Sequence, residues 1–166
     1  MALTVYGYVR GTQDIDLGTS VTSLDVLRQL EQALRGAGLH ARLRLPDDED
    51  PLGGVLRIWD RVDEEGEPLE PVEVVNFCNP LRPMRNPGPA AIRRAMPLGT
   101  TPLRCVRLAD LIALKLFAGS FADLADVVAL IERNPDADEA EIRATCAQYG
   151  LEGRLEALLD PPSNGR

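Results

Sequence analysis

Arg10-Gly11-Thr12-Gln13-Asp14-Ile15-Asp16-Leu17 places two acidic residues two positions apart near the N-terminus. In an extended strand such side chains point to the same face, so Asp14 and Asp16 would project together and Ile15 would be anchored in a core on the other face. Adjacent carboxylates repel each other unless one takes up a proton or a cation joins them. Mg²⁺ is a hard cation that suits such oxygen ligands. The spacing alone favours an acidic strand end in solvent, because Asp-x-Asp is common by chance.

The composition is typical of one globular domain. The chain has 166 residues, 45% of them hydrophobic, which suits a single core. Cys78, Cys105 and Cys146 are widely spaced, which argues against a disulfide framework and a zinc site. His40 is the only histidine, so histidine-based metal clusters and Ser-His or Cys-His catalysis are unsupported. No apolar run approaches the roughly 20 residues that span a bilayer. We expect a cytoplasmic protein with no membrane partner.

The charge is spread unevenly. A net charge of −8 makes the chain a poor general binder of nucleic acid, because phosphate contacts need local positive charge. Between Glu73 and Asp110, however, there is no acidic residue, and this interval holds Arg82, Arg85, Arg93, Arg94, Arg104 and Arg107. This basic stretch could face a triphosphate or an RNA backbone such as that of tRNA. Alternatively, its arginines pair with acidic loops elsewhere in the chain.

Lysine usage gives a separate clue. Lys115 is the only lysine among 18 basic residues, and it stands inside an apolar helical run. This suggests a site that needs a compact ammonium group. Without further signals, a lysine that reaches solvent from a half-buried helix is the preferred interpretation, and the motif described below shifts the preference to a functional lysine.

Hydrophobic patterning predicts a mixture of strands and helices. A capping box at residues 22–25 predicts a helix that glycines 36 and 38 close. The acidic run at 47–50 is expected to be a solvated loop without a metal role, and residues 79–102 to be mostly loop, with one helical turn at 90–96. Strands are predicted at 15–19, 39–45, 55–59 and 72–77, and later helices at 107–119, 121–133, 138–149 and 151–159.

Two motifs resemble one family. Arg10-x-Thr12-x-Asp14-Ile15-Asp16-Leu17 resembles the Arg-x-Thr-x-Asp-Ile-Asp-Leu signature of bacterial nucleotidyltransferase-fold proteins of the AbiEii toxin-like group. Asp110-Leu-Ile-Ala-Leu-Lys115-Leu-Phe-Ala118, followed by Asp123-Leu-Ala-Asp126, is similar to a second motif of that group, Asp-Leu-Ile-x-x-Lys-x-x-Ala and then Asp-x-x-Asp. Two ordered motifs about a hundred residues apart are more specific than either alone.

The resemblance implies a fold of the α/β (α+β) class, similar to a minimal DNA polymerase beta-like nucleotidyltransferase. A mixed β-sheet flanked by helices would occupy residues 1–107, a helical part packed on this core would occupy 108–160, and 161–166 would be a frayed tail. In the group, a Gly-Gly or Gly-Ser pair after a first strand helps to hold the nucleotide phosphates. Residues 2–6 would be the tail of the helix that follows this pair. We therefore expect Met1 to be an internal start, downstream of a missing strand and glycine turn.

The resemblance also implies the metal ligands Asp14, Asp16 and Glu73, with Mg²⁺ or Mn²⁺ as the cofactor. In the group a third carboxylate, most often Asp, lies on a strand beside the Asp-x-Asp pair. Glu73 is the best match, although it is longer by one methylene. A glutamate on a buried strand is costly unless it meets a cation or a donor, and Asn76 would point to the other face.

Further nucleotide-binding residues follow from the same resemblance. Arg10 would brace the aspartates or meet a phosphate, and Thr12 would hydrogen-bond the turn or a phosphate oxygen. Lys115 would reach the triphosphate as a fourth catalytic residue, and Asp123 would orient it. For Asp123 and Asp126 the alternative is negative charge at the start of a helix.

The implied activity is metal-dependent transfer of a nucleotidyl group from an NTP to a hydroxyl of tRNA or of a protein. The enzyme would be the toxin of a toxin–antitoxin pair, with a cognate antitoxin as partner. An alternative is a catalytically degenerate nucleotide- or protein-binding module of the same fold, which the missing glycine turn, Glu73 and the acidic charge all fit. A third reading is the antitoxin-like or structural half of a two-gene pair.

Overall fold

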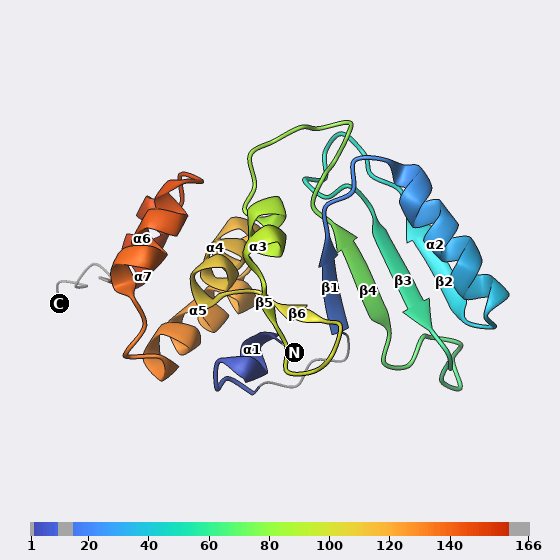
Figure 1. The fold of residues 1–166 in the computed structure, drawn as a ribbon, viewed down its shortest axis with the longest axis horizontal. Coiled ribbons are helices and arrows are strands. Elements are labelled where there is room, and N and C mark those ends of the chain that lie inside the picture. The colour runs from blue at the N-terminus through green and yellow to red at the C-terminus, as the bar shows by residue number, and fades with distance from the viewer. Residues whose placement is uncertain (1, 10–14, 160–166) are drawn as a thin grey trace. The chain divides into compact units, whose positions relative to one another are not determined.

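The computed structural model describes residues 2–9 and 15–159, which form two compact units (Figure 1). The sheet unit is Gly11–Met84, and the helical unit combines Met1–Arg10 with Arg85–Arg166. A mixed sheet, a smaller sheet and C-terminal helices confirm the expected mixed α/β class. The domain boundaries at 107 and 160 that the resemblance implies stay a prediction.

The sheet unit is built on four strands in the order β1-β4-β3-β2. β1 runs parallel to β4, whereas β4 with β3 and β3 with β2 are antiparallel. The sheet is therefore mixed, and the β1–β4 pair joins segments that are separated in the chain by one helix and two strands. The strands are β1 (Ile15–Thr19), β2 (His40–Arg44), β3 (Val55–Trp59) and β4 (Val72–Asn76).

Helix α2 (Leu24–Gly36) packs against β2 and β3. Its N-cap is Ser23, whose hydroxyl accepts a hydrogen bond of 3.2 Å from the backbone N–H of Asp25. The capping residue therefore lies one position later than the predicted box, whose first residue is Thr22. Leu27 on the helix and Leu56 on the sheet are both almost fully buried, which identifies the face of the sheet that α2 covers.

The face of the sheet that α2 covers becomes more exposed toward the edge strand β1. Leu56 is in register with Val74, and Val74 with Leu17, so these side chains share the covered face. Ile15 was expected to be anchored in a core, but it is 38% exposed. That expectation is wrong because β1 is an edge strand of the described sheet, and α2 packs on β2 and β3 instead.

Asn76 ties the end of β4 to two neighbouring segments. Its side chain is fully buried, donates to the carbonyls of Val21, Gly53 and Cys78, and accepts from the N–H groups of Val21 and Cys78. A Cβ on Gly53 would lie 1.9 Å from the Cys78 carbonyl oxygen. Only glycine therefore fits beside this strand end.

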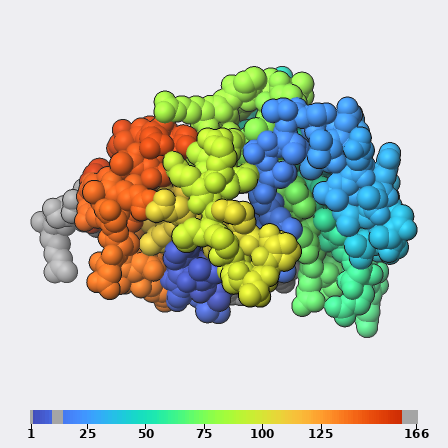
Figure 2. All heavy atoms as spheres, viewed as in Figure 1, coloured from blue at the N-terminus to red at the C-terminus, as the bar shows by residue number. Residues whose placement is uncertain are grey.

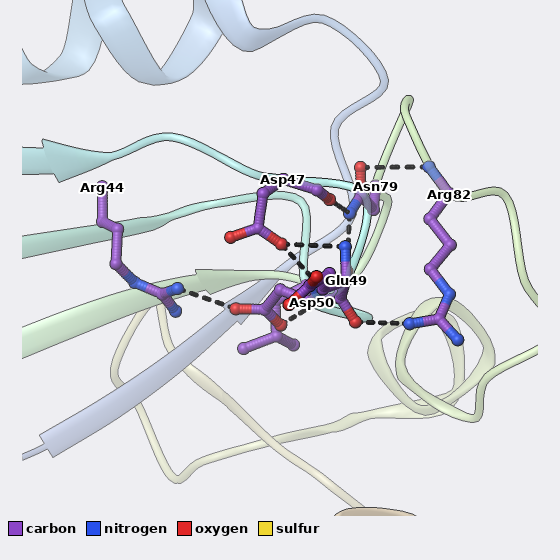
Figure 3. Close-up of polar contacts among 7 residues, drawn as sticks. Arg44, Asp47, Glu49, Asp50, Asn79 and Arg82 are labelled. Atoms are coloured by element: carbon purple, nitrogen blue, oxygen red, sulfur yellow. Dashed lines mark hydrogen bonds and ion pairs between the residues drawn. The ribbon is translucent and has the colours of Figure 1, made fainter.

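The acidic loop at 47–50 is held by a second asparagine (Figure 3). The amide group of Asn79 donates to the carbonyls of Asp47 and Asp50, each at 2.7 Å. The Asp50 carboxylate pairs with Arg44 at 2.7 Å. Burial alone would raise the pKa of Asp50, but hydrogen bonds from Leu52 and Arg44 lower it overall. Residues 47–49 are exposed, as expected of a solvated loop, and the Asp50 carboxylate has a structural role.

The helical unit packs around helix α4, which is apolar on most of its surface, as a buried helix requires. Ile112 and Leu116 of α4 are fully buried, as are Val127 and Leu130 of α5. Leu3 of the N-terminal helix packs in the same core. The elements are α1 (Ala2–Val5), α3 (Gly88–Arg94), β5 (Met96–Pro97), β6 (Arg104–Cys105), α4 (Leu108–Ala118), α5 (Phe121–Arg133), α6 (Glu139–Ala147) and α7 (Glu152–Leu159).

The last two helices lie against each other, and their spheres are coloured orange to red in Figure 2. Arg143 of α6 joins them through an ion pair with Glu156 of α7.

All three cysteines are free thiols. Within the described residues, no helix is long and apolar enough to cross a membrane.

Candidate functional site

Charged side chains line up across all four strands of the sheet. Asp16 on β1 is in register with Glu73 on β4, Glu73 with Arg57 on β3, and Arg57 with Arg42 on β2. Residues directly opposite on neighbouring strands point to the same face. The four side chains therefore form one line, which we call the charged row. Its acidic half lies on β1 and β4, and its basic half lies on β2 and β3.

The charged row lies on the face opposite to α2. Arg57 alternates along β3 with Leu56, which faces α2, so the two side chains point in opposite directions. The side chain of Glu73 is 28% exposed and that of Arg57 is 43% exposed, and Asp16 and Arg42 are exposed residues. A ligand in solvent can therefore reach the row.

Asp16 and Glu73 are brought side by side, as the resemblance implied. Neighbouring strands lie about 4.8 Å apart, so two carboxylates in register can share one cation. Such a donor set fits Mg²⁺ or Mn²⁺, which prefer carboxylate oxygens. Asn76 lies three positions after Glu73 and points to the other face, also as expected.

The third expected ligand, Asp14, lies outside the described residues, as do Arg10 and Thr12. Across residues 2–9 and 15–159, no three His, Cys, Asp or Glu side chains gather closely enough to hold a metal ion. Whether Asp14 completes the set of three carboxylates stays a prediction from the resemblance.

Arg57 is a site residue that the sequence did not reveal. Its Nε lies 3.5 Å from Oε1 of Glu73. This nitrogen is buried, yet it forms no hydrogen bond with the residues that the structure describes. Arg57 is the one charged residue of the otherwise apolar strand β3, which marks it as facing away from the core. Its position beside Glu73 depends on the pairing of β3 with β4, which the sequence alone does not give.

In the helical unit, Lys115 binds two carboxylates. Its Nζ lies 2.7 Å from Oδ1 of Asp123 and 2.9 Å from Oδ2 of Asp126. Asp126 is almost fully buried, and the other two side chains are less than one-fifth exposed. Asp123 also accepts from the hydroxyl of Ser120 at 2.6 Å, and its N–H donates to that hydroxyl at the start of α5. We call Lys115, Asp123 and Asp126 the lysine cluster.

The electrostatics of the lysine cluster keep Lys115 and Asp123 charged. Burial alone would lower the pKa of Lys115, but hydrogen bonds to Asp123 and Asp126 raise it above its ordinary value. Burial alone would raise the pKa of Asp123, but Lys115 and Ser120 lower it overall. Lys115 is therefore a permanent ammonium group and cannot act as a base near neutral pH. Its contact with Asp123 is confirmed, whereas its reach to a triphosphate stays a prediction.

Asp110, the first residue of the second motif, holds two helices together. It is 2% exposed and receives hydrogen bonds from Nε of Arg94 at 3.1 Å and from a second guanidinium nitrogen. The hydrogen bonds to Asp110 raise the pKa of Arg94. This two-point ion pair joins α3 to α4 and accounts for Asp110 without any ligand.

The arginines of the basic stretch largely contact the protein itself. Arg82 belongs to the sheet unit and the others to the helical unit. For five of the six arginines the partners are two carbonyls, two carboxylates and one aromatic ring, which favours the alternative of internal pairing. The contacts are Arg82 with the carbonyl of Glu49, Arg85 over the ring of Tyr149, Arg94 with Asp110, Arg104 with the carbonyl of Ala95, and Arg107 with Glu141 at 3.0 Å.

No protein-family model matches the chain, and a comparison with curated proteins gives no match either. The motifs and the geometry of the charged row are therefore the grounds on which a function can be argued.

Proposed function

We propose that the chain is a metal-dependent nucleotidyltransferase, which moves a nucleotidyl group from an NTP to a hydroxyl acceptor. The observation that carries this proposal is the register of Asp16 with Glu73 on parallel strands. Asp14, two positions before Asp16, extends the pair to three carboxylates. The resemblance of the two motifs to the AbiEii toxin-like group supports the same chemistry.

In this proposal Asp14, Asp16 and Glu73 hold Mg²⁺ or Mn²⁺. When bound, such ions lower the pKa of an attacking hydroxyl and neutralise a leaving pyrophosphate. The sheet fixes the spacing of Asp16 and Glu73, because side chains on strands are positioned more rigidly than those on loops. Glu73 would also accept the proton of the attacking hydroxyl.

Arg10 and Thr12 would contact the phosphates from the segment before β1. A contact of Lys115 with the triphosphate stays a prediction from the resemblance, because Asp123 and Asp126 already pair with its ammonium group. The proposed acceptor is a hydroxyl of tRNA or of a protein, and the proposed setting is a toxin–antitoxin pair in the cytoplasm, with an antitoxin as partner. A neighbouring gene for a small helix-turn-helix protein would support this setting.

The direct test measures transfer of label from an α-labelled NTP to total tRNA or protein in the presence of Mg²⁺. We expect Asp16→Asn to lower transfer at least about 100-fold without unfolding the protein, because it removes one negative charge from the proposed metal site. Asp60→Asn is the matched control, since Asp60 is an exposed carboxylate of the same unit. Transfer by Asp16→Asn at the wild-type rate would contradict the assignment.

A second candidate is a degenerate module that binds a nucleotide without turning it over. It is favoured by the internal pairing of two assigned residues, Glu73 with Arg57 and Lys115 with Asp123 and Asp126. Mg²⁺-dependent binding of an NTP, with no label transferred to any acceptor, would support this candidate.

A further inference from the structure

The ion pair between Arg57 and Glu73 has the geometry of a loose contact. Its Nε to Oε1 distance of 3.5 Å is at the long limit for a hydrogen bond, and Nε forms none with the described residues. Both side chains are partly exposed. A loose ion pair between partly exposed side chains contributes little to stability, so a stronger ligand can separate them.

If the carboxylates bind a metal, that metal must compete with Arg57 for Glu73. Glu73 lies between Asp16 on one neighbouring strand and Arg57 on the other. A divalent cation between Asp16 and Glu73 would repel the guanidinium and replace it as the counter-charge of Glu73. The guanidinium would then remain on the same face of the sheet, beside the proposed metal site.

We propose that Arg57 has two alternating partners: Glu73 while the carboxylates hold no metal, and the phosphates of the NTP once Glu73 binds a metal. This inference rests on the proposed function. A guanidinium suits both partners, because its planar set of donors matches carboxylates and phosphates in the same two-point geometry. Arg57 thereby limits the repulsion between the carboxylates of the free protein and adds affinity for the NTP.

The first measurement is Mn²⁺ binding without nucleotide, followed by the loss of the free-ion electron paramagnetic resonance signal. Arg57→Gln should bind Mn²⁺ about two- to fivefold more tightly than the wild type, because the competing cation is gone. Arg57→Lys keeps the positive charge and should bind like the wild type. Arg28→Gln removes an exposed arginine of the same unit and controls for the change in net charge. An equal or lower affinity in Arg57→Gln would overturn the inference.

The second measurement is the affinity for a non-hydrolysable NTP analogue at saturating Mg²⁺. Arg57→Gln and Arg57→Lys should both bind it at least about tenfold more weakly, because lysine lacks the planar fork. A merely structural arginine would change neither affinity in a protein that unfolds at the wild-type temperature. Unchanged analogue binding in both variants would also overturn the inference.

Glu73→Gln separates this inference from the function on which it rests. If the wild type binds Mn²⁺, Glu73→Gln does not, and Arg57→Gln is unchanged, only the role of Arg57 is refuted. If the wild type binds no Mn²⁺, or Glu73→Gln binds it equally well, the metal site itself is refuted, and both proposals fail together.

Discussion

At the scale of single residues, Asn76 shows how strongly one amide can hold a strand end. Its five hydrogen bonds join β4 to Val21, Gly53 and Cys78. Leucine has a similar volume but would leave these backbone groups buried without partners. We expect Asn76→Leu to lower the free energy of unfolding by about 2–4 kcal/mol, measured by urea denaturation. Gln29→Ala, at an exposed helical position, should change it by less than about 0.5 kcal/mol. Equal effects of the two variants would contradict this role of Asn76.

Lys115 gives a second prediction for a single residue. Asp126 is 1% exposed, and the ammonium group of Lys115 lies 2.9 Å from it. Replacing Lys115 with methionine leaves a buried carboxylate without this cation, so Lys115→Met should cost about 3 kcal/mol of unfolding free energy at pH 7. A loss below about 1 kcal/mol would mean that the lysine cluster does not stabilise the helical unit.

The same cluster predicts a pH dependence. The folded-state pKa of Asp123 lies below its ordinary value of 3.8. The stabilisation is therefore complete above the ordinary pKa and is lost as the pH falls through the folded value. Lys115→Met removes the main partner that lowers this pKa. Between pH 5 and pH 3, its unfolding free energy should therefore fall less steeply than that of the wild type. Parallel curves from urea titrations at each pH would contradict the coupling.

At the scale of elements, the close contact at the start of β3 can be tested with two glycines. A Cβ at Gly53 would collide with the Cys78 carbonyl, whereas nothing lies within 4 Å of a Cβ at Gly36 in α2. Gly53→Ala should therefore destabilise the protein by at least about 2 kcal/mol. Gly36→Ala should stabilise it by up to about 1 kcal/mol, because alanine favours helix. The measurement is the thermal unfolding temperature of both variants. An unchanged temperature in Gly53→Ala would show that the backbone around this contact shifts at no cost.

The elements that the sequence predicted well are those with strong local signals. Ser120 caps α5, and apolar residues recur at helical spacing along this helix, which ends at Arg133. The predicted and observed bounds therefore agree. The β-branched residues of β4 marked that strand in the same way. The pair β5 and β6 was missed because strands of two residues show no alternation. Ser23 rather than Thr22 caps α2, since neighbouring hydroxyl residues carry the same local signal.

At the scale of the whole molecule, the sequence cannot show contacts between distant segments. Leu3 packs in the core of the helical unit, and no local pattern links it to α4. The neighbouring positions of Asp16 and Glu73 were expected from the resemblance, because composition and spacing say nothing about which strands pair. Arg57 was missed for the same reason, since its place beside Glu73 is set by the register of β3 with β4.

The central claim is that Asp16 and Glu73 form part of a metal site for nucleotidyl transfer. A crystal structure of the protein with Mn²⁺ and a non-hydrolysable NTP analogue tests it most directly, through the anomalous scattering of the metal. We predict an anomalous peak between the carboxylates of Asp16 and Glu73, with the phosphates of the analogue beside it. Mn²⁺ bound elsewhere, or carboxylates that point away from each other with no metal between them, would contradict the claim.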